Sequence, residues 1–364
     1  MSKLRVLELF GGIGACSKAL ERLGIDYEIA DYVEIDKYAV KSFNAIHNTN
    51  FEPQDICEWD KDMEVDLLMH GSPCQDFSIS GYNRGGDKDS GTRSSLMYET
   101  IRIVKKLRPK YVIWENVKNL LSKKHIHNFN NYLEAMEQLG YTNYYQVLNA
   151  KDYGVPQNRE RVFTISIRKD FDFDFEFPQK QELRLTIEDI EEHEIADKFV
   201  IKKALNIKNT KNYIQWSNSG KMQNSQAERA YYEQGLAPTV SSCNSNGDKT
   251  QIITSYKEYT NFYTIPRGSD GKLINGSYNR VWKKEKYVGT INLTKITEIG
   301  QLMEQGLIIR KLTPKECWRL MGFDDEDFEQ ASQFNSNTQL YKQAGNSIVV
   351  NVLEAILRKL LLNE

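Results

Sequence analysis

The sequence predicts an α/β fold with a mostly parallel sheet that is covered by helices on both faces. Short apolar runs alternate with amphipathic segments through the first half of the chain, which is the pattern of repeated βα units. The chain has 364 residues, of which 40% are hydrophobic, and this is enough for one large domain or two ordinary ones. The βα pattern stops after about Asp170, which indicates a second, irregular domain.

The first βα unit shows the pattern most clearly. An apolar run at residues 4–9 stops at Gly11 and Gly12, and helical spacing follows from residue 16 to residue 23. Gly24 then stands where a helix would be capped. Further strands are expected at residues 27–33, 65–69, 111–114 and 162–167. Further helices are expected around residues 97–104 and 129–136.

These patterns divide the chain into three parts. Residues 1–178 carry the βα units. Residues 179–334 are rich in Asn, Ser, Lys, Tyr and Gly and form the predicted inserted domain. Residues 335–364 return to apolar helical spacing, so we expect this C-terminal segment to pack back on the first domain.

Composition excludes several classes of protein. Mean hydropathy is −0.59, and the chain has neither an apolar stretch long enough to span a bilayer nor a secretory signal, so we expect a soluble protein of the cytoplasm. The five cysteines form no Cys-x-x-Cys pair, which argues against a zinc or redox site. The net charge of −2 gives no overall attraction to nucleic acid, so any such binding needs a local basic face.

The glycine-rich turn at residues 10–14 is a candidate ligand site. The missing side chains let a ligand approach the backbone and the helix N-terminus. Two alternatives also fit: a tight turn that binds nothing, and a dinucleotide-binding site. Glu34, about 20 residues later at the end of the second strand, can accept hydrogen bonds from both hydroxyls of a ribose. Asp55, which we place after the third candidate strand, can accept from an adenine amine.

Cys74 is the candidate nucleophile. It follows the strand at 65–69 in the run Gly-Ser-Pro-Cys-Gln, and ligands of open α/β sheets bind beyond the carboxyl ends of the strands. The preceding proline fixes the backbone direction, and a thiolate is a strong nucleophile, whereas the alternative is a buried packing cysteine. The polar, glycine-rich residues 76–95 fit either an active-site lid or a surface loop.

Two polar clusters follow the next strands. Glu115 lies at the end of the strand at 111–114, on the same sheet edge as Cys74, where apolar surroundings would raise its pKa and suit a proton donor. Alternation before the strand at 162–167 places Gln157, Arg159 and Arg161 on one side, suited to gripping a carboxylate or a carbonyl oxygen. A surface acid and a surface salt-bridge ladder are the respective alternatives.

In this order the motifs resemble those of the DNA (cytosine-5) methyltransferase family of bacteria and phages. The resemblance covers nearly all of the first 170 residues and about the last 55, including Arg310–Phe323 and the run Gln-Ala-Gly-Asn-Ser at 343–347. It implies a Rossmann-like, S-adenosylmethionine-dependent methyltransferase sheet with a smaller inserted target-recognition domain. Residues 1–178 would then be catalytic and cofactor-binding, and residues 179–334 would select the DNA sequence and supply a return hinge.

The resemblance also implies how the methyl donor is held. Phe10 would lie against the adenine, with Gly11, Gly12 and Gly14 near the amino-acid part of S-adenosylmethionine. Glu34 would bind the ribose, Ile35 would flank the adenine, Asp55 would accept from it, and Asn346 would lie near the methionine portion. Ile35 departs from the aromatic residue that some members have there.

The implied catalytic residues are Cys74, Glu115, Arg159 and Arg161. Cys74 would add to carbon 6 of a cytosine extruded from double-stranded DNA, so that carbon 5 becomes nucleophilic. Glu115 would protonate or hydrogen-bond nitrogen 3, and Arg161 would hold the 2-carbonyl and orient Glu115. The chemistry needs no metal, and the base that removes the carbon 5 proton is not identified by the sequence.

Three other functions fit parts of the sequence. A transfer RNA cytosine-5 methyltransferase of the same fold is the main alternative, although the large insertion favours DNA. A DNA-binding module without turnover leaves the catalytic set unexplained, and a nicotinamide dehydrogenase leaves the Cys74 and arginine motifs unexplained. We expect a monomer, and the sequence leaves open whether a cognate restriction endonuclease forms a restriction-modification system with it.

Overall fold

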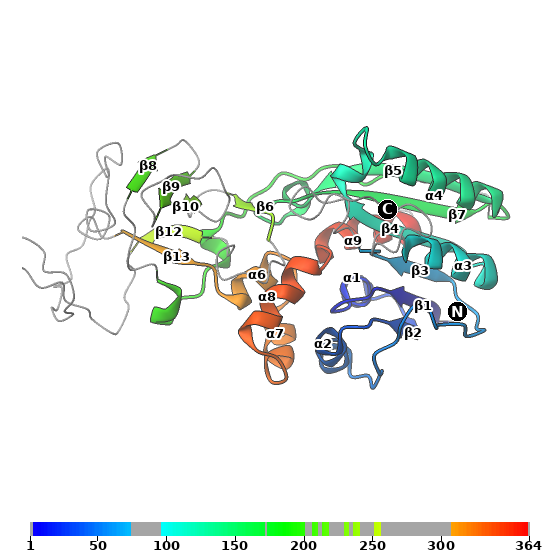
Figure 1. The fold of residues 1–364 in the computed structure, drawn as a ribbon, viewed down its shortest axis with the longest axis horizontal. Coiled ribbons are helices and arrows are strands. Elements are labelled where there is room, and N and C mark those ends of the chain that lie inside the picture. The colour runs from blue at the N-terminus through cyan, green and yellow to red at the C-terminus, as the bar shows by residue number, and fades with distance from the viewer. Residues whose placement is uncertain are drawn as a thin grey trace, which may run out of the picture. The chain divides into compact units, whose positions relative to one another are not determined.

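The computed structural model (Figure 1) describes most of the chain in two compact units. The described residues are 3–73, 96–171, 173–200, 206–209, 213–217, 229–232, 236–240, 251–255 and 307–362. The first unit comprises Met1–Leu185, Ala237–Ser245 and Pro314–Glu364, and the second comprises Thr186–Leu236 and Asn246–Thr313.

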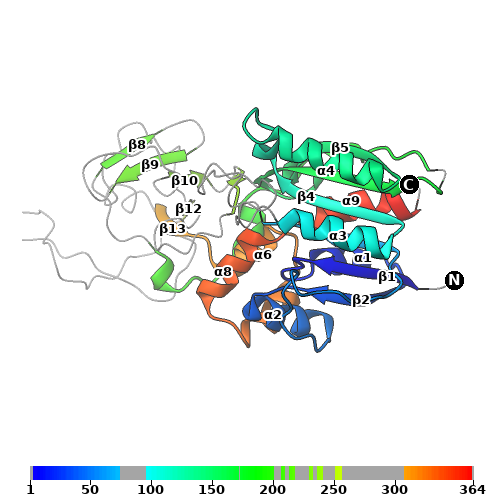
Figure 2. The same cartoon turned by 45° about the vertical axis from the view of Figure 1, so that its right-hand side comes forward.

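A six-stranded sheet with the order β2-β1-β3-β4-β7-β5 forms the centre of the first unit (Figure 2). Its strands are β1 Leu4–Leu9, β2 Tyr27–Val33, β3 Leu67–His70, β4 Tyr111–Val117, β5 Tyr141–Asn149 and β7 Glu160–Arg168. Strands β2, β1, β3 and β4 are parallel, whereas β7 is antiparallel to both of its neighbours. The predicted α/β class is therefore confirmed, with a mixed sheet in which only β7 runs against the others.

The first unit contains helices before, between and after these strands. They are α1 Ala15–Arg22, α2 Lys37–His47, α3 Met97–Leu107, α4 Ile126–Gln138, α6 Pro314–Arg319, α7 Asp325–Ser332, α8 Asn337–Asn346 and α9 Val350–Leu357. Side chains from α3 and α4 share one buried cluster with Leu7, Leu9 and Trp114 of the sheet. The neighbouring strand residues Val6 and Ile113 are fully buried outside that cluster, as alternation along a strand requires.

The C-terminal helix packs within the first unit. Helix α9 lies against α1 in the first unit, and Val350, Leu353 and Ile356 are fully buried. These residues recur at spacings of three, which places them on one face of the helix. The end of the chain is therefore part of the same core as its beginning.

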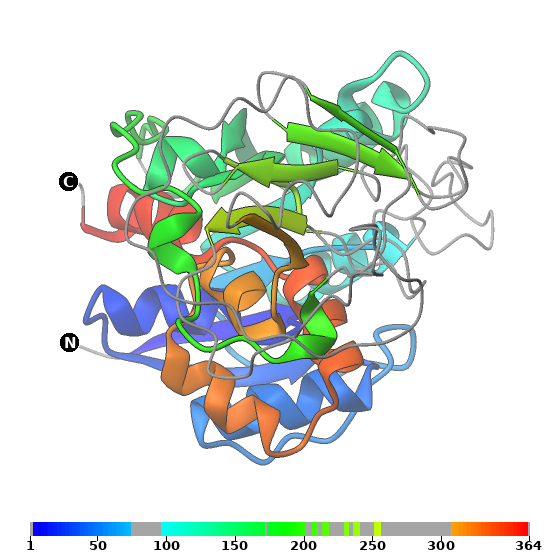
Figure 3. The same ribbon diagram turned by 90° about the vertical axis from the view of Figure 1, so that its left-hand side faces the viewer.

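The second unit contains a five-stranded sheet with the order β13-β12-β10-β9-β8 (Figure 3). The strands are β8 Asn206–Asn209, β9 Tyr213–Ser217, β10 Arg229–Tyr232, β12 Gln251–Ser255 and β13 Leu307–Lys311. Ile187, Ile190 and Ile252 are buried in this unit, and the buried Arg310 pairs with Glu191 at 3.5 Å. The unit overlaps the predicted domain at 179–334 without coinciding with it, and its role in recognition remains a prediction.

Several local features differ from the sequence-based expectations. Helix α2 and strand β5 were not predicted, and β4 continues three residues beyond Trp114, so that Glu115 lies within the strand. The placement of Asp55 was wrong, because this residue lies between α2 and β3 and therefore precedes the third strand. The predicted strand at 65–69 itself follows Asp55 in the sequence, so the residue belongs to the segment that leads into β3.

The described part of the chain shows neither a membrane-spanning helix nor a cluster of metal ligands. None of its helices is both long enough and apolar enough to cross a membrane. The same residues contain no group of three or more His, Cys, Asp or Glu side chains that could hold a metal ion.

Candidate active site

The carboxyl ends of β3 and β4 are joined by hydrogen bonds to Ser72. The indole Nε1 of Trp114 donates to Ser72 Oγ at 3.0 Å, and Asn116 Nδ2 donates to the Ser72 carbonyl at 3.3 Å. The chain is therefore fixed against β4 immediately before Pro73. Cys74 follows Pro73 in the sequence, but Cys74 and the predicted lid at 76–95 lie outside the described residues.

Glu115 is buried beside this segment and is not a surface acid, since only 9% of the residue is exposed. A Cβ atom placed on Gly71 would lie 3.9 Å from Glu115 Oε2, so the carboxyl group adjoins the residues that lead to Cys74. Burial raises the pKa of Glu115, and this effect exceeds the opposing attraction of Arg161 and Arg159. A raised pKa is the direction that a proton donor would need, and the catalytic role of Glu115 stays a prediction.

The two arginines of the predicted motif have different partners. Arg161 Nε lies 3.0 Å from Glu115 Oε1 in an ion pair that is largely buried. Arg159 instead donates to three backbone carbonyls, with Nη1 bound to Val240 at 3.1 Å and Nη2 bound to Gly345 at 3.1 Å and Ser347 at 2.8 Å. Glu160, between the two arginines, is exposed and pairs with Lys118 at the surface. A surface ladder therefore does not describe the arginines.

The glycine-rich turn needs glycine at two positions for steric reasons. A Cβ on Gly11 would lie 2.7 Å from the ring of Tyr32, and a Cβ on Gly14 would lie 2.1 Å from His47 Nε2. Gly14 also has a φ of +81°, in the left-handed region that favours glycine. Tyr32, which the sequence analysis did not single out, donates from its hydroxyl to the Gly12 carbonyl at 2.7 Å. The turn is therefore held in one shape by β2.

Glu34 has hydrogen-bonding capacity left for a ligand. Its Oε2 accepts from Gly12 N at 3.2 Å and its Oε1 accepts from Asp36 N at 2.8 Å. A carboxylate has about four acceptor positions, so each oxygen can accept one further bond, as two ribose hydroxyls would require. Burial raises the pKa of Glu34, and the backbone N–H groups of Asp36, Gly12 and Ile35 partly offset this effect. Gly12 and Glu34 thus join the glycine turn to the end of β2.

Ile35 and Asp55 lie in segments that adjoin Glu34. Ile35 is 67% exposed, which is unusual for a large apolar residue and suits the face of a nucleobase. Asp55 is exposed, and its Oδ1 accepts from Cys57 N at 2.9 Å. The backbone of Gln54 binds the Glu34 carbonyl at 2.9 Å, which brings the Asp55 segment beside Glu34.

Asp31 organises the Asp55 segment, although the sequence analysis did not identify it. Its carboxylate accepts from Gln54 Nε2 at 3.0 Å, from Trp59 Nε1 at 2.7 Å and from Lys61 Nζ at 2.7 Å. These three donors come from residues on both sides of Asp55 along the chain. The one signal in the sequence is an acid among the apolar residues at the end of a predicted strand, because a buried carboxylate needs partners.

The other two candidate residues lie at an end of β1 and an end of α8. Phe10 is half-buried and has a φ of +52°, directly before the glycines. Asn346 is the exposed last residue of α8, between the two residues whose carbonyls bind Arg159. The carboxylates, the exposed apolar side chain and the open turn together fit an adenosine group with a charged amino-acid tail.

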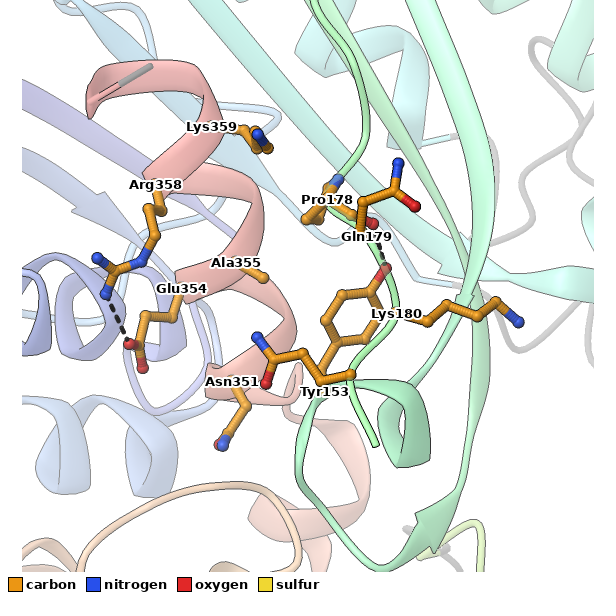
Figure 4. A pocket seen from close by; sticks show the side chains of 10 residues that line it. Tyr153, Pro178, Gln179, Lys180, Asn351, Glu354, Ala355, Arg358 and Lys359 are labelled. Atoms are coloured by element: carbon orange, nitrogen blue, oxygen red, sulfur yellow. Dashed lines mark hydrogen bonds and ion pairs between the residues drawn. The ribbon is translucent and has the colours of Figure 1, made fainter. Parts of the chain in front are cut away.

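A separate cavity of about 510 Å³ lies between residues 178–181 and the C-terminal helix (Figure 4). Tyr153 lines it and donates from its hydroxyl to the Pro178 carbonyl at 3.0 Å. Lys180 pairs with Asp152 at 3.0 Å, and Arg358 lies 3.5 Å from Glu354. None of the candidate site residues lines this cavity, and we assign it no ligand.

Comparison with known proteins gives consistent similarities over the whole chain. The family model described as C-5 cytosine-specific DNA methylase matches residues 4–362. The orphan methyltransferase M.SPRI of Bacillus phage SPR is 33% identical, with 99% of this chain and 98% of that protein covered. The type II methyltransferase M2.ScrFI of Lactococcus lactis subsp. cremoris is 33% identical, with coverage of 98% and 99%. The crystal structure of S. pombe Dnmt2 methyltransferase has the same fold, with a TM-score of 0.64, 18% identity and 99% of each chain covered.

Proposed function

We propose a mechanism from one premise: the chain belongs to the C-5 cytosine-specific DNA methylase family and is a DNA (cytosine-5-)-methyltransferase. In this proposal Cys74 forms a covalent adduct with a cytosine that has been flipped out of a specific double-stranded DNA sequence. The observation that carries the mechanism is the buried carboxyl group of Glu115, paired with Arg161 and adjoining the Gly71–Pro73 segment that leads to Cys74.

The proposed reaction begins with addition of the Cys74 thiolate to carbon 6 of the base. The ring would become an enamine whose carbon 5 attacks an electrophilic methyl group. S-adenosylmethionine is the proposed donor and supplies that methyl group as a sulfonium substituent. A base then removes the proton from carbon 5, and the electron pair of that C–H bond expels Cys74 and restores the aromatic ring. The target must leave the stacked duplex for any of these atoms to be reached.

Glu115 is the proposed proton donor to nitrogen 3. Its raised pKa keeps the carboxyl group protonated to a higher pH than an exposed glutamate, so it can neutralise charge as the thiolate adds. The ion pair with Arg161 fixes the orientation of this carboxyl group, and the remaining guanidinium N–H groups can bind the 2-carbonyl of the base. Removal of Glu115 would therefore affect the addition step and not the holding of the donor.

The donor would be held by the residues around the glycine turn. Glu34 has acceptor positions for the ribose, and Ile35 offers an exposed apolar face to the adenine. Gly12 and Gly14 leave the backbone open to the amino-acid part, while Phe10, Gly11, Asp55 and Asn346 complete the proposed set. This assignment follows the fit of the side chains to adenosine and to a charged tail.

No feature of the described residues favours one of the three alternative functions. The family match is to DNA methylases, and the likeness to Dnmt2 at 18% identity concerns the fold alone. The relatives include both a type II and an orphan methyltransferase, so similarity favours neither a cognate endonuclease nor a solitary enzyme. We keep a monomer that reads DNA through its second unit as the working proposal.

The proposed adduct can be tested with a duplex that contains 5-fluorocytosine at the target position. Fluorine cannot be removed as a proton is, so after methyl transfer the enzyme should remain attached to the DNA through Cys74. Mass spectrometry of the full chain with S-adenosylmethionine should map the adduct to that residue. Cys57→Ala, which changes an exposed cysteine elsewhere, is the matched control and should still form the adduct. An adduct mapped to another residue, or normal turnover by Cys74→Ala, would overturn the mechanism.

A further inference from the structure

The guanidinium group of Arg159 is directed to the backbone. An arginine has five N–H donors, and three of those of Arg159 go to the carbonyls of Val240, Gly345 and Ser347. Only 4% of the residue is exposed. Arg161, two positions later, makes the ion pair with Glu115 at 3.0 Å. The two arginines of one motif thus have separate tasks.

The contacts of Arg159 satisfy the end of a helix. The last four carbonyls of an α-helix have no partner within the helix, and the C-terminal end carries partial negative charge. Helix α8 ends at Asn346, and Arg159 binds the carbonyls on either side of that residue. A positively charged side chain from the residue just before β7, 186 positions away in sequence from Gly345, therefore caps α8.

Helix α8 is also attached to the segment that follows Glu34. Lys342 Nζ lies 2.6 Å from Asp36 Oδ2, and Gln343 Nε2 donates to the Tyr38 carbonyl at 2.9 Å. Asp36 in turn caps α2 by accepting from Tyr38 N at 3.0 Å. The helix is thus fixed at its middle to the proposed ribose-binding segment and at its end to Arg159. Its last residue, Asn346, depends on both attachments for its position.

We infer that Arg159 is a positioning residue that caps α8 and thereby holds Asn346 for the methyl donor, whereas Arg161 acts on Glu115 and the target base. The inference rests on the proposed use of S-adenosylmethionine and deepens it. A lysine at this position keeps the positive charge near Glu115 but cannot span three carbonyls with a planar fork. Arg159→Lys should therefore weaken binding of the donor more than it slows the chemical step.

Calorimetric titration of the full chain with S-adenosylmethionine tests this directly. We expect Arg159→Lys to raise the dissociation constant about tenfold, equivalent to about 1.4 kcal/mol. Asn346→Ala should have a similar effect, and the double variant should bind no more weakly than the weaker single variant, because both changes affect one contact. Lys118→Gln, which breaks the exposed ion pair with Glu160 in the same motif, is the matched control and should bind normally.

A variant that leaves Arg159 unchanged tests the same inference even where replacement of Arg159 impairs folding. Lys342→Met breaks the other attachment of α8, at a residue that is one third exposed, and should weaken donor binding several-fold. Unchanged binding by folded Arg159→Lys, or by Lys342→Met, would overturn the inference. Strictly additive effects of Arg159→Lys and Asn346→Ala would also contradict it.

Single-turnover methylation at saturating donor separates positioning from catalysis. For Arg159→Lys, we expect the pH profile of this step to match the parent, since the charge next to Glu115 is kept. A large loss of rate with unchanged donor binding would show that Arg159 touches the reacting groups. If the parent chain does not bind S-adenosylmethionine at all, the proposed function fails at the cofactor, which is a different result from failure of this inference.

Discussion

Two buried carboxyl groups near the first strands have raised pKa values, but their surroundings give them different roles. Glu115 lies against Gly71 and pairs with Arg161, so its proton can be delivered at the edge of the sheet. Glu8 lies within β1, where it accepts from Ser17 N at 3.0 Å and also from the Ser17 hydroxyl, and burial raises its pKa to about 7. The raised pKa of Glu115 serves the proposed chemistry, whereas the raised pKa of Glu8 makes the stability of the fold depend on pH.

Glu115→Gln tests the catalytic shift. The amide keeps the volume and can hydrogen-bond the base, but it cannot deliver a proton to nitrogen 3 as Cys74 adds. We expect the single-turnover rate to fall by about 100 to 10,000-fold, the usual range for general acid catalysis. Donor affinity should barely change, because Glu34 and the glycine turn are separate from Glu115. A rate within about threefold of the parent would remove Glu115 from the mechanism.

Glu8→Gln tests the shift that affects folding. The folded pKa of about 7 lies above the value of 4.5 expected in the unfolded chain, so the folded state holds a proton that the unfolded state loses between these values. Stability is therefore greatest below about pH 4.5 and is lost as pH rises to about 7. Relative to the parent, the amide variant should be more stable by up to about 3 kcal/mol at pH 8 and by less than about 1 kcal/mol at pH 5.

Urea denaturation of both proteins at the two pH values measures this difference. The matched control is Glu52→Gln, which changes an exposed glutamate and should show the same stability as the parent at both values. A difference between Glu8→Gln and the parent that does not depend on pH would mean that the pKa of Glu8 is not raised in the folded state.

At the scale of elements, the sequence was most informative where strands are fully buried. The apolar runs at residues 67–69 of β3 and 111–114 of β4 are continuous, because both faces of a central strand are covered. Strand β5 escaped prediction because it lies at the edge of the sheet and its residues alternate irregularly between buried and exposed. The contacts of Arg159 could not be predicted either, since backbone carbonyls have no signature in the sequence. The position of Glu115 at the carboxyl edge of the sheet could be predicted, because the carboxyl ends of parallel strands lie at the same edge.

The turn between β1 and α1 allows a paired test of its glycines. Gly14 has a φ of +81° and no room for a Cβ atom, whereas Gly24 at the other end of α1 has a φ of +64° and open space around it. Gly24→Ala should cost about 1 kcal/mol from backbone strain alone. Gly14→Ala adds the displacement of the His47 ring and should cost about 3 kcal/mol or more. Equal losses of stability in urea denaturation would show that the space around Gly14 does not matter.

At the scale of the whole molecule, the second unit interrupts the first twice along the chain. The segment at residues 237–240 belongs to the first unit, although residues of the second unit precede and follow it. Its strand β11, Ala237–Pro238, pairs with β6, Gln157–Asn158, and Val240 N donates to Gln157 Oε1 at 3.1 Å. This segment therefore supports the arginine motif, whatever DNA sequence the second unit recognises.

Helices α6 and α7 also belong to the first unit. Trp318 is fully buried, and its indole donates to the Leu340 carbonyl at 2.9 Å. The buried Lys18 of α1 pairs with Asp327 of α7 at 3.0 Å. An exchange that follows the sequence-based boundaries at 179–334 would replace these helices and leave their partners behind. We expect such a chimaera to fold poorly.

The structure suggests a better exchange to test whether the second unit selects the DNA sequence. Residues 186–313 should be replaced by the corresponding block of a relative with a different recognition sequence, with residues 237–240 kept from this chain. Because Ala237 and Val240 then keep their bonds to residues 156–159, the catalytic unit should retain its activity. Bisulfite sequencing of DNA from cells that express the chimaera should show methylation at the relative's sequence. If methylation stays at the original sequence, recognition lies in the first unit. A second chimaera should also exchange residues 237–240. If only this second chimaera loses activity, the segment at 237–240 serves catalysis.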